Sequence, residues 1–369
     1  MNVVVTGGGT AGHVFPALAT ATALRDEHGA SIVFVGASDG QEARLVPDAG
    51  FRFVPVRVTA AQARVSFATM RAVAYALRGS RSVRRLVRGA DVVVSIGGFA
   101  SGPAALAARR TRRPLVLIEP NSVPGIVNRI AARWAAAVAT TFEGTAARLP
   151  KDVRIERTGN PIRTEIAAVP DRRERLRAEA CDAFGLEPDR RTVFVFGGSQ
   201  GALHIDQVLA GVFPALAGRA DLQLLVSAGP GRDVEVARTV DPAAALRVAV
   251  VPFVDRMDRA FALADLVVAR AGGSVAEVTA CGLPSILVPY PYATENHQEA
   301  NARELVAAGA ARMVLDRDLS SSTLVTAILD LMDDPAARSA MGASARAWAR
   351  PDAASRIADL CAEVAGLGR

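Results

Sequence analysis

Short runs of apolar, mostly β-branched residues alternate along this chain with longer stretches rich in alanine, leucine and arginine. In the first half the apolar runs are NVVVTG, SIVFVG, FRFVPV, DVVVSIGG, PLVLIE and AAVATTF. The second half repeats the pattern with TVFVFGG, LQLLVSAG, LRVAVVPFV, LVVARAGG, SILVPY and ARMVL. Strands that alternate with helices indicate βαβ units. Near-continuous apolar strands are typical of parallel sheets that are covered on both faces.

The repetition of this pattern predicts two doubly wound α/β domains. A chain of 369 residues exceeds the usual size of a single core, and 50% of its residues are hydrophobic. Between the halves, RTGNPIRTEIAAVPDRRE (residues 157–174) has the composition of a linker. We expect domains over residues 1–160 and 161–345, followed by a helix over 346–369 that packs back on the first domain.

Each half opens with a strand, a glycine-rich turn and a helix, at residues 7–12 and 197–202. The first turn fits G-x-G-x-x-G, whose backbone amides suit a phosphate group. It is compatible with a dinucleotide site that uses Asp39, with a sugar-nucleotide site or with a purely structural turn. The second turn, which contains Ser199, favours a two-domain enzyme with both turns at one cleft.

Two places in the first half carry candidate catalytic groups. His13 follows the first turn at a helix start, where it suits a general base or a hydrogen bond to an oxyanion. Glu119 and Asn121 follow a strand, where a carboxylate can orient a group or accept a proton and an amide can contact a hydroxyl. The alternatives are a capping or packing histidine, and a turn acid next to an Asx-turn.

The second half offers polar groups at two further helix starts. Arg270 and the glycines at 272–273 precede a helix that carries Glu277, a pattern that suits a phosphate and ribose hydroxyls. His297 and Gln298 begin another helix, where glutamine can contact sugar hydroxyls. The alternatives are an acid that complements the helix dipole and ordinary capping.

Metal and redox chemistry receive little support from the sequence. Residues 316–318 read D-x-D, but they precede a helix away from the glycine-rich turns, and we assign them to capping and surface charge. No other group has metal-ligand spacing, so we predict neither a metal nor a cofactor. Cys181, Cys281 and Cys361 are far apart and are expected to be buried thiols in a reducing compartment.

The segment between Asp48 and Asp91 contains nine arginines and no acid. Its basic amphipathic stretch suits an anionic membrane surface, the alternative being a solvated helix face. The arginines concerned are Arg71, Arg78, Arg81, Arg84, Arg85 and Arg88. Aromatic residues make up only 5% of the chain, which argues against nucleic-acid binding. With no signal-peptide pattern and no membrane-spanning run, we expect a peripheral protein on the cytoplasmic side.

Taken together, the motifs resemble one family, the bacterial N-acetylglucosaminyltransferases of peptidoglycan synthesis (the MurG family). The matching strings follow the family's order over nearly the whole chain. They are GGGTAGHVFPALA, SIGGFASGPAALAA, EPNSVPGIVNR, TGNPIR, FGGSQGA, FVDRM, RAGGSVAEVTACGLPSILVPYP, HQEANA and LVAAGAA.

The resemblance implies a GT-B fold, with two Rossmann-like domains that face a cleft. It also implies an inverting, metal-independent transfer of N-acetylglucosamine (GlcNAc) from UDP-GlcNAc. The acceptor is the 4-hydroxyl of undecaprenyl-diphosphate-MurNAc-peptide (lipid I), and the product is lipid II. The implied location is the anionic inner face of the bacterial cell membrane, where other wall-synthesis proteins are possible partners.

The resemblance also assigns residues to the two substrates. On the donor side are Val254 at the uracil, Glu277 at the ribose, and Arg163, Ser199, Arg270, Gly272, Gly273 and Ser274 around the diphosphate and sugar. His297, Gln298, Asn121 and Asn128 complete the substrate contacts. On the acceptor side are Thr10, Ala11 and Gly12, with His13 and Glu119 at positions tied to catalysis.

Several positions depart from the family pattern. Ile118 and Pro120 replace a histidine and a glutamine, Phe99 replaces a tyrosine and Asp206 replaces an asparagine. The stretch 270–277 is one residue shorter than usual. Two other functions therefore stay open: a related UDP-sugar transferase with another lipid acceptor, and a catalytically weak binding protein at the membrane surface. A sugar-nucleotide epimerase shares the architecture but does not require the basic segment.

Overall fold

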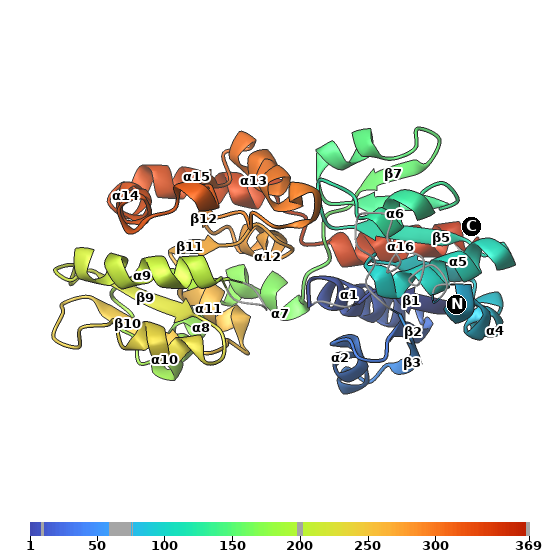
Figure 1. Cartoon of the computed structure of the whole chain (residues 1–369), viewed down its shortest axis with the longest axis horizontal. Helices are drawn as coiled ribbons and strands as arrows, with labels where there is room; N and C mark the ends of the chain where they lie inside the picture. The colour runs from blue at the N-terminus through green and yellow to red at the C-terminus, as the bar shows by residue number, and fades with distance from the viewer. Residues whose placement is uncertain (9–10, 59–74, 76, 198–201, 367–369) are drawn as a thin grey trace. The chain divides into compact units, whose positions relative to one another are not determined.

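The computed structural model describes residues 1–8, 11–58, 75, 77–197 and 202–366, and it divides into two compact units (Figure 1). Unit 1 comprises Met1–Arg163 and Arg350–Arg369, and unit 2 comprises Thr164–Ala349. These limits differ by a few residues from the division at 160 and 345 that the sequence suggests.

Unit 1 contains a parallel sheet in the order β3-β2-β1-β4-β5-β6-β7. Its strands are β1 (Asn2–Thr6), β2 (Ser31–Ala37), β3 (Arg52–Val56), β4 (Val92–Ser95), β5 (Leu115–Glu119), β6 (Ala137–Thr140) and β7 (Arg154–Arg157). Its helices are α1 (Ala11–His28), α2 (Glu42–Asp48), α4 (Arg84–Arg88), α5 (Gly102–Thr111), α6 (Ile126–Ala131) and α16 (Ala353–Val364). Val3 and Val5 pack into one core cluster and Val4 into another, because helices cover both faces of the sheet.

Unit 2 repeats this design with the order β10-β9-β8-β11-β12-β13. Its strands are β8 (Arg191–Phe196), β9 (Leu222–Ser227), β10 (Arg247–Val251), β11 (Leu266–Ala269), β12 (Ser285–Leu287) and β13 (Arg312–Met313). Its helices are α7 (Thr164–Ala167), α8 (Val169–Phe184), α9 (Leu203–Ala215), α10 (Arg232–Ala237), α11 (Met257–Leu263), α12 (Val275–Ala280), α13 (His297–Ala307), α14 (Ser321–Met332) and α15 (Pro335–Trp348). The predicted fold class, two doubly wound α/β domains, is confirmed.

The strand order reverses between β1 and β4 in unit 1 and between β8 and β11 in unit 2. In open parallel sheets, ligands bind beyond the carboxyl ends of the strands at such a switch point. The strands β1 and β8, which precede the two glycine-rich motifs in the sequence, therefore each lie at the switch point of their unit.

The end of the chain returns to unit 1, where α16 packs along α1 (Figure 1). Its apolar side, including Leu360, joins the core cluster that contains β1. At the rim, His28 Nε2 lies 3.0 Å from Asp359 Oδ1, and Arg154 donates two hydrogen bonds of 2.7 and 3.0 Å to Glu363. Apolar burial together with these polar contacts anchors the terminal helix.

One local prediction was wrong in part, and one strand was missed. The expected linker at 157–174 is helical from Thr164 onward, because Pro170 lies in the first turn of α8, where the missing N–H of proline costs nothing. The strand β7 was missed because RIER is mostly charged, as is common at a sheet edge. The prediction of three buried free thiols is confirmed.

Candidate active site

In unit 1 the turns after β1 and β4 touch each other. A Cβ on Gly98 would lie 2.7 Å from the carbonyl oxygen of Gly8 and 3.8 Å from His13 Cε1. Gly98 also has φ +76°, a conformation that only glycine adopts without strain. His13, half-buried in the first turn of α1, therefore lies over the carboxyl end of β4, at the switch point of the sheet.

Glu119, the last residue of β5, is the centre of a hydrogen-bonded loop. Its Oε1 accepts hydrogen bonds from the backbone N–H of Asn121 (3.0 Å) and from Asn121 Nδ2 (3.3 Å). Its Oε2 accepts from the backbone N–H of Gly125 (3.0 Å) and from Asn128 Nδ2 (3.0 Å). Only 2% of Glu119 is exposed. The carboxylate thus fixes the loop between β5 and α6.

Burial raises the pKa of Glu119 to about 7, although the four hydrogen bonds oppose the rise by favouring the charged form. A carboxylate has about four lone-pair positions, and here four N–H groups use them. This geometry favours the orienting role that the sequence left open for Glu119. Asn128 completes the loop, and its Oδ1 is buried without a hydrogen-bond partner among the described residues.

The sequence did not reveal the acid that lies against the first glycine-rich turn. Glu42 is 1% exposed, and its Oε1 accepts a hydrogen bond of 2.8 Å from the backbone N–H of Ala37. A Cβ on Gly8 would lie 2.0 Å from Glu42 Oε1, and one on Gly36 would lie 2.6 Å from Glu42 Cγ. Asp39, the acid considered for a dinucleotide, is exposed instead. The available signal in the sequence was the pair of glycines, Gly8 and Gly36, that lie against Glu42.

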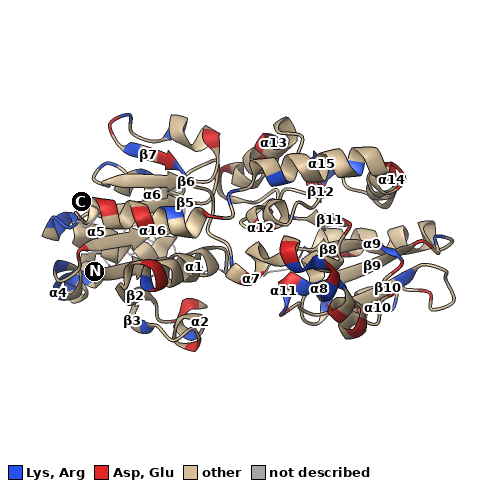
Figure 2. Cartoon of the chain, turned by 180° about the vertical axis from the view of Figure 1, so that it is seen from behind, with Lys and Arg blue, Asp and Glu red and all other residues tan. Residues whose placement is uncertain are grey.

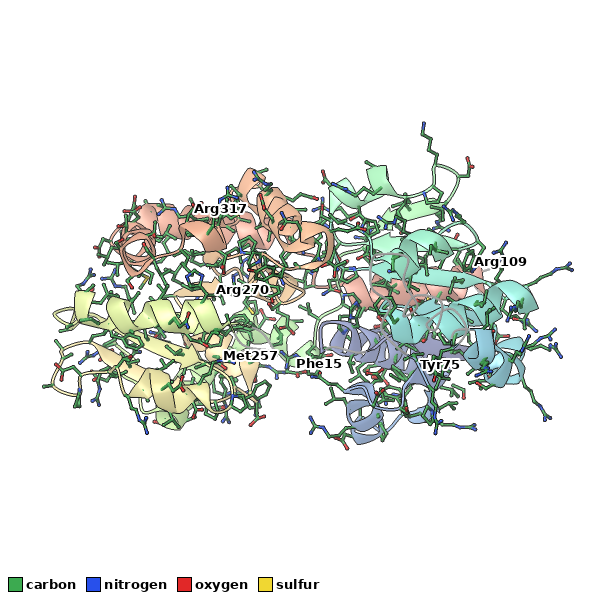
Figure 3. All side chains as sticks on the ribbon, viewed as in Figure 1. Phe15, Tyr75, Arg109, Met257, Arg270 and Arg317 are labelled. Carbon is green, nitrogen blue, oxygen red and sulfur yellow. The ribbon has the colours of Figure 1, made fainter. Side chains whose placement is uncertain are left out.

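The other candidates of unit 1 are placed as follows. Thr10 and the side chain of Ala11 lie outside the described residues, and Gly12 is exposed. Arg163 belongs to unit 1, and its guanidinium carbon lies 4.8 Å from the centre of the ring of Phe15, a residue that Figure 3 labels. The structure therefore places this arginine on the first unit, near the start of α1.

In unit 2 the central cation is Arg270, which follows β11 and is 7% exposed. Its Nη1 donates to the carbonyl oxygens of Val288 (3.2 Å) and Pro289 (3.3 Å) and to Asp316 Oδ1. Its guanidinium carbon lies 5.5 Å from the centre of the Tyr290 ring. Its Nε is buried and has no partner among the residues that the structure describes.

The two aspartates of the D-x-D motif lie in different environments. Asp316 is 14% exposed at its side chain and pairs with Arg270 and His204, whereas Asp318 is 61% exposed. Burial alone would raise the pKa of Asp316, but the hydrogen bonds from Arg270 and His204 outweigh it and lower the pKa. Arg317 lies at the outer surface (Figure 3). The assignment to capping and surface charge is therefore wrong for Asp316, because a buried arginine requires a counter-charge.

Two of the predicted sugar contacts in unit 2 lie together. Gln298 Oε1 accepts a hydrogen bond of 2.9 Å from the backbone N–H of Tyr290, and a Cβ on Gly272 would lie 3.7 Å from Gln298 Nε2. His297 instead donates through Nδ1 to the carbonyl of Thr294 (2.9 Å) and closes its own turn. Gln298 thus faces the glycine turn after β11.

The remaining donor candidates are placed as follows. Gly273 and Ser274 precede α12, and Glu277 is half-buried in its first turn. Val254 is buried in the loop after β10, and Ser199 lies outside the described residues.

One departure from the family pattern has a clear partner in this chain. Asp206, in the first turn of α9, accepts a hydrogen bond of 2.9 Å from Arg232 Nε. Burial nevertheless raises the pKa of Asp206 to about 6.

Arginines gather over α4 and the end of α5 (Figure 2). All those of the predicted membrane segment that the structure describes are exposed, namely Arg78, Arg81, Arg84, Arg85 and Arg88, while Arg71 lies outside the described residues. Next to them, Arg109 stacks 4.9 Å over the ring of Trp134. Among the described residues, no helix has the length and apolar character needed to span a bilayer.

Two doubly wound α/β units in one chain are the GT-B type of fold, a fold that nucleotide-sugar enzymes use. Residues 3–140 match the glycosyltransferase family 28 N-terminal domain, and residues 192–357 match the glycosyltransferase family 28 C-terminal domain. The chain belongs to glycosyltransferase family 28.

Several relatives carry the same name. The chain is 37% identical to the UDP-N-acetylglucosamine--N-acetylmuramyl-(pentapeptide) pyrophosphoryl-undecaprenol N-acetylglucosamine transferase of Halothermothrix orenii, over 99% of each chain. It is 40% identical to the protein of the same name from Clavibacter michiganensis subsp. michiganensis, over 97% of this chain and 95% of the relative. Among solved structures, MurG of Acinetobacter baumannii is similar with a TM-score of 0.78 and 27% identity, over 98% of this chain and 99% of that one.

Proposed function

We propose that this protein transfers GlcNAc from UDP-GlcNAc to N-acetylmuramyl-(pentapeptide) pyrophosphoryl-undecaprenol (lipid I), which gives lipid II. One observation carries the proposal: the similarity to relatives named for this reaction runs through both units over 99% of the chain. A similarity confined to one nucleotide-binding unit would support donor binding alone. A transferase must bind two substrates, and here both units match.

In this proposal, unit 2 binds the donor. The Nε of Arg270, which has no partner among the described residues, supports contact with the diphosphate, since an arginine edge suits phosphate oxygens. Gln298, beside Gly272, is suited to the sugar hydroxyls, and Glu277 is suited to the ribose. Arg270 also neutralises charge on the leaving diphosphate, the task that a metal ion performs in other transferases.

Unit 1 takes the acceptor, and we assign the proton transfer to His13. The acceptor 4-hydroxyl attacks C1 of GlcNAc while His13 accepts its proton, and the C1–O bond breaks with its electron pair going to UDP. A single displacement of this kind inverts the configuration at C1. His13 is preferred over Glu119 because four N–H groups already occupy the Glu119 carboxylate.

The activity is tested with purified protein, UDP-GlcNAc and a lipid I analogue, by measuring UDP release and lipid II together. UDP-galactose and UDP-glucose serve as donor controls. We expect turnover with UDP-GlcNAc only, and a fall of about 100-fold in kcat for His13→Ala with UDP binding nearly unchanged. No turnover by protein that binds UDP would contradict the transferase and favour a donor-binding protein. Unchanged turnover in His13→Ala would remove His13 from the mechanism.

We also propose that the exposed arginines of α4 and the preceding helical turn contact the anionic inner face of the cell membrane. Their surroundings support this, because Asp91 is the only acid between residues 49 and 118. Each arginine near such a surface contributes about 1 kcal/mol. Vesicle sedimentation tests the proposal, with a variant in which glutamine replaces Arg81, Arg84, Arg85 and Arg88.

This variant should bind anionic vesicles more than about tenfold more weakly than the wild type does. A matched control replaces four exposed arginines of unit 2, namely Arg175, Arg238, Arg247 and Arg317, and should bind like the wild type. Equal losses in both variants would mean that total charge, not this face, determines membrane binding.

A further inference from the structure

Arg270 is held by one end of its guanidinium group. All three of its hydrogen bonds to described residues leave from Nη1, and they go to two backbone carbonyls and to Asp316. The ring of Tyr290 lies 5.5 Å from the guanidinium carbon. The opposite edge, formed by Nε and Nη2, makes no hydrogen bond to any described residue, although Nε is buried. Within the part of the chain that the structure describes, one edge of a buried arginine is thus left for a ligand.

The carboxylate that holds Nη1 is itself held. Asp316 Oδ1 pairs with Arg270, while Asp316 Oδ2 accepts a hydrogen bond of 2.9 Å from His204 Nδ1. The three residues come from separate elements: the first turn of α9, the end of β11 and the segment after β13. Because each oxygen has its own partner, the carboxylate plane is fixed, and the plane of the guanidinium is fixed with it.

We infer that Asp316, held by His204, is a positioning residue that turns the Nε–Nη2 edge of Arg270 toward the donor diphosphate. This inference rests on the proposed function. An arginine binds phosphate best through two parallel N–H groups, which requires a defined orientation of the fork. Donors that are already oriented toward developing charge lower the barrier without reorganising during the reaction.

A different role for Asp316 must be separated from this one. A buried aspartate–arginine pair can simply neutralise charge and stabilise unit 2. In that case the loss of Asp316 lowers activity through folding, whatever cation occupies position 270. If Asp316 acts by orienting the guanidinium group, its loss lowers kcat only when residue 270 is an arginine. A lysine carries a point charge and has no planar edge to orient.

The test is a double-mutant cycle on donor turnover with Asp316→Asn and Arg270→Lys. Asp316→Asn should lower kcat by about tenfold, as expected when one hydrogen bond to a charged group is lost. The KM for UDP-GlcNAc should change less than about threefold. Removing the negative charge of Asp316 makes the site more positive, and this favours binding of the anionic donor. In the Arg270→Lys background, the same change should lower kcat less than about twofold.

Two further variants sharpen the cycle. Asp316→Glu keeps the charge and should recover part of the lost kcat. Asp318→Asn removes an exposed carboxylate two residues away and should leave kcat unchanged. The number of UDP sites per chain, from calorimetry, reports the folded fraction in every variant.

Equal loss of kcat from Asp316→Asn in both backgrounds would overturn the inference, and so would wild-type kcat in Asp316→Asn. If Asp316→Asn fails to fold, His204→Ala runs through the same cycle, with an expected loss of about threefold that disappears in Arg270→Lys. A wild-type protein without turnover would remove the proposed function itself. Wild-type turnover with additive losses would remove only the positioning role.

Discussion

Glu119 makes the stability of unit 1 depend on pH in a direction that can be derived from the structure. Burial raises its pKa from 4.5 to about 7 on folding. Between these values the folded chain holds a proton that the unfolded chain has lost, so stability falls as pH rises. The contribution is fully present below pH 4.5 and is lost as pH rises through 7. A difference of about 2.5 pKa units corresponds to about 3 kcal/mol.

The informative variant is Glu119→Gln, because an amide resembles the protonated carboxyl in shape and cannot ionise. Relative to the wild type, this variant should gain about 3 kcal/mol in free energy of unfolding between pH 4 and pH 8. Most of the gain should appear below pH 7. Both chains share every other titrating group, so the contributions of those groups to the free energy of unfolding cancel in the difference.

Urea unfolding measures this difference, with Trp134 as the reporter of unit 1 in a Trp348→Phe background, because the chain contains two tryptophans. Glu143→Gln is the control, since it makes the same chemical change in unit 1 at a side chain that is 75% exposed. A pH-independent difference between wild type and Glu119→Gln would refute the raised pKa. A wild type that gains on the variant as pH rises would show that the four N–H groups outweigh burial.

Three further predictions follow from the packing. Gly98→Ala should lower the free energy of unfolding of unit 1 by about 2 kcal/mol or more, measured by urea unfolding, because its φ is +76° and the Gly8 carbonyl blocks a Cβ. Gly218→Ala, which meets no atom within 4 Å, should be nearly neutral. Gly8→Ala should displace the Glu42 carboxylate, and most of its cost in the same assay should disappear when Glu42→Ala is added. A maleimide should label the native chain far more slowly than the urea-unfolded chain, because burial raises the pKa of the thiols Cys181, Cys281 and Cys361.

The strands were predictable where consecutive residues are all buried. Twelve of the strands were found because each is a short apolar run, as expected when both faces of a parallel sheet are covered. The strand β7 lies at the sheet edge, where half of its surroundings are solvent, so its composition carries no such signal. The start of α8 was not predicted for a different reason. Proline is common both in turns and in the first turn of a helix, and tertiary packing decides which of the two forms.

The site was predictable only where its residues are neighbours in sequence. A motif such as RAGGS reveals Arg270, but the partner that holds Arg270 lies 46 residues away, and the histidine behind that partner lies 112 residues from Asp316. Strand order explains why these groups meet: β8, β11, β12 and β13 are consecutive in the sheet, and their carboxyl ends share one edge. A polar residue just after any of these strands is therefore a candidate partner for any other. Applied to the sequence, this rule would have ranked Asp316 above Asp318 as a candidate site residue, because Asp316 follows β13 more closely. It would also have predicted contact between Asp316 and the residues that begin α9.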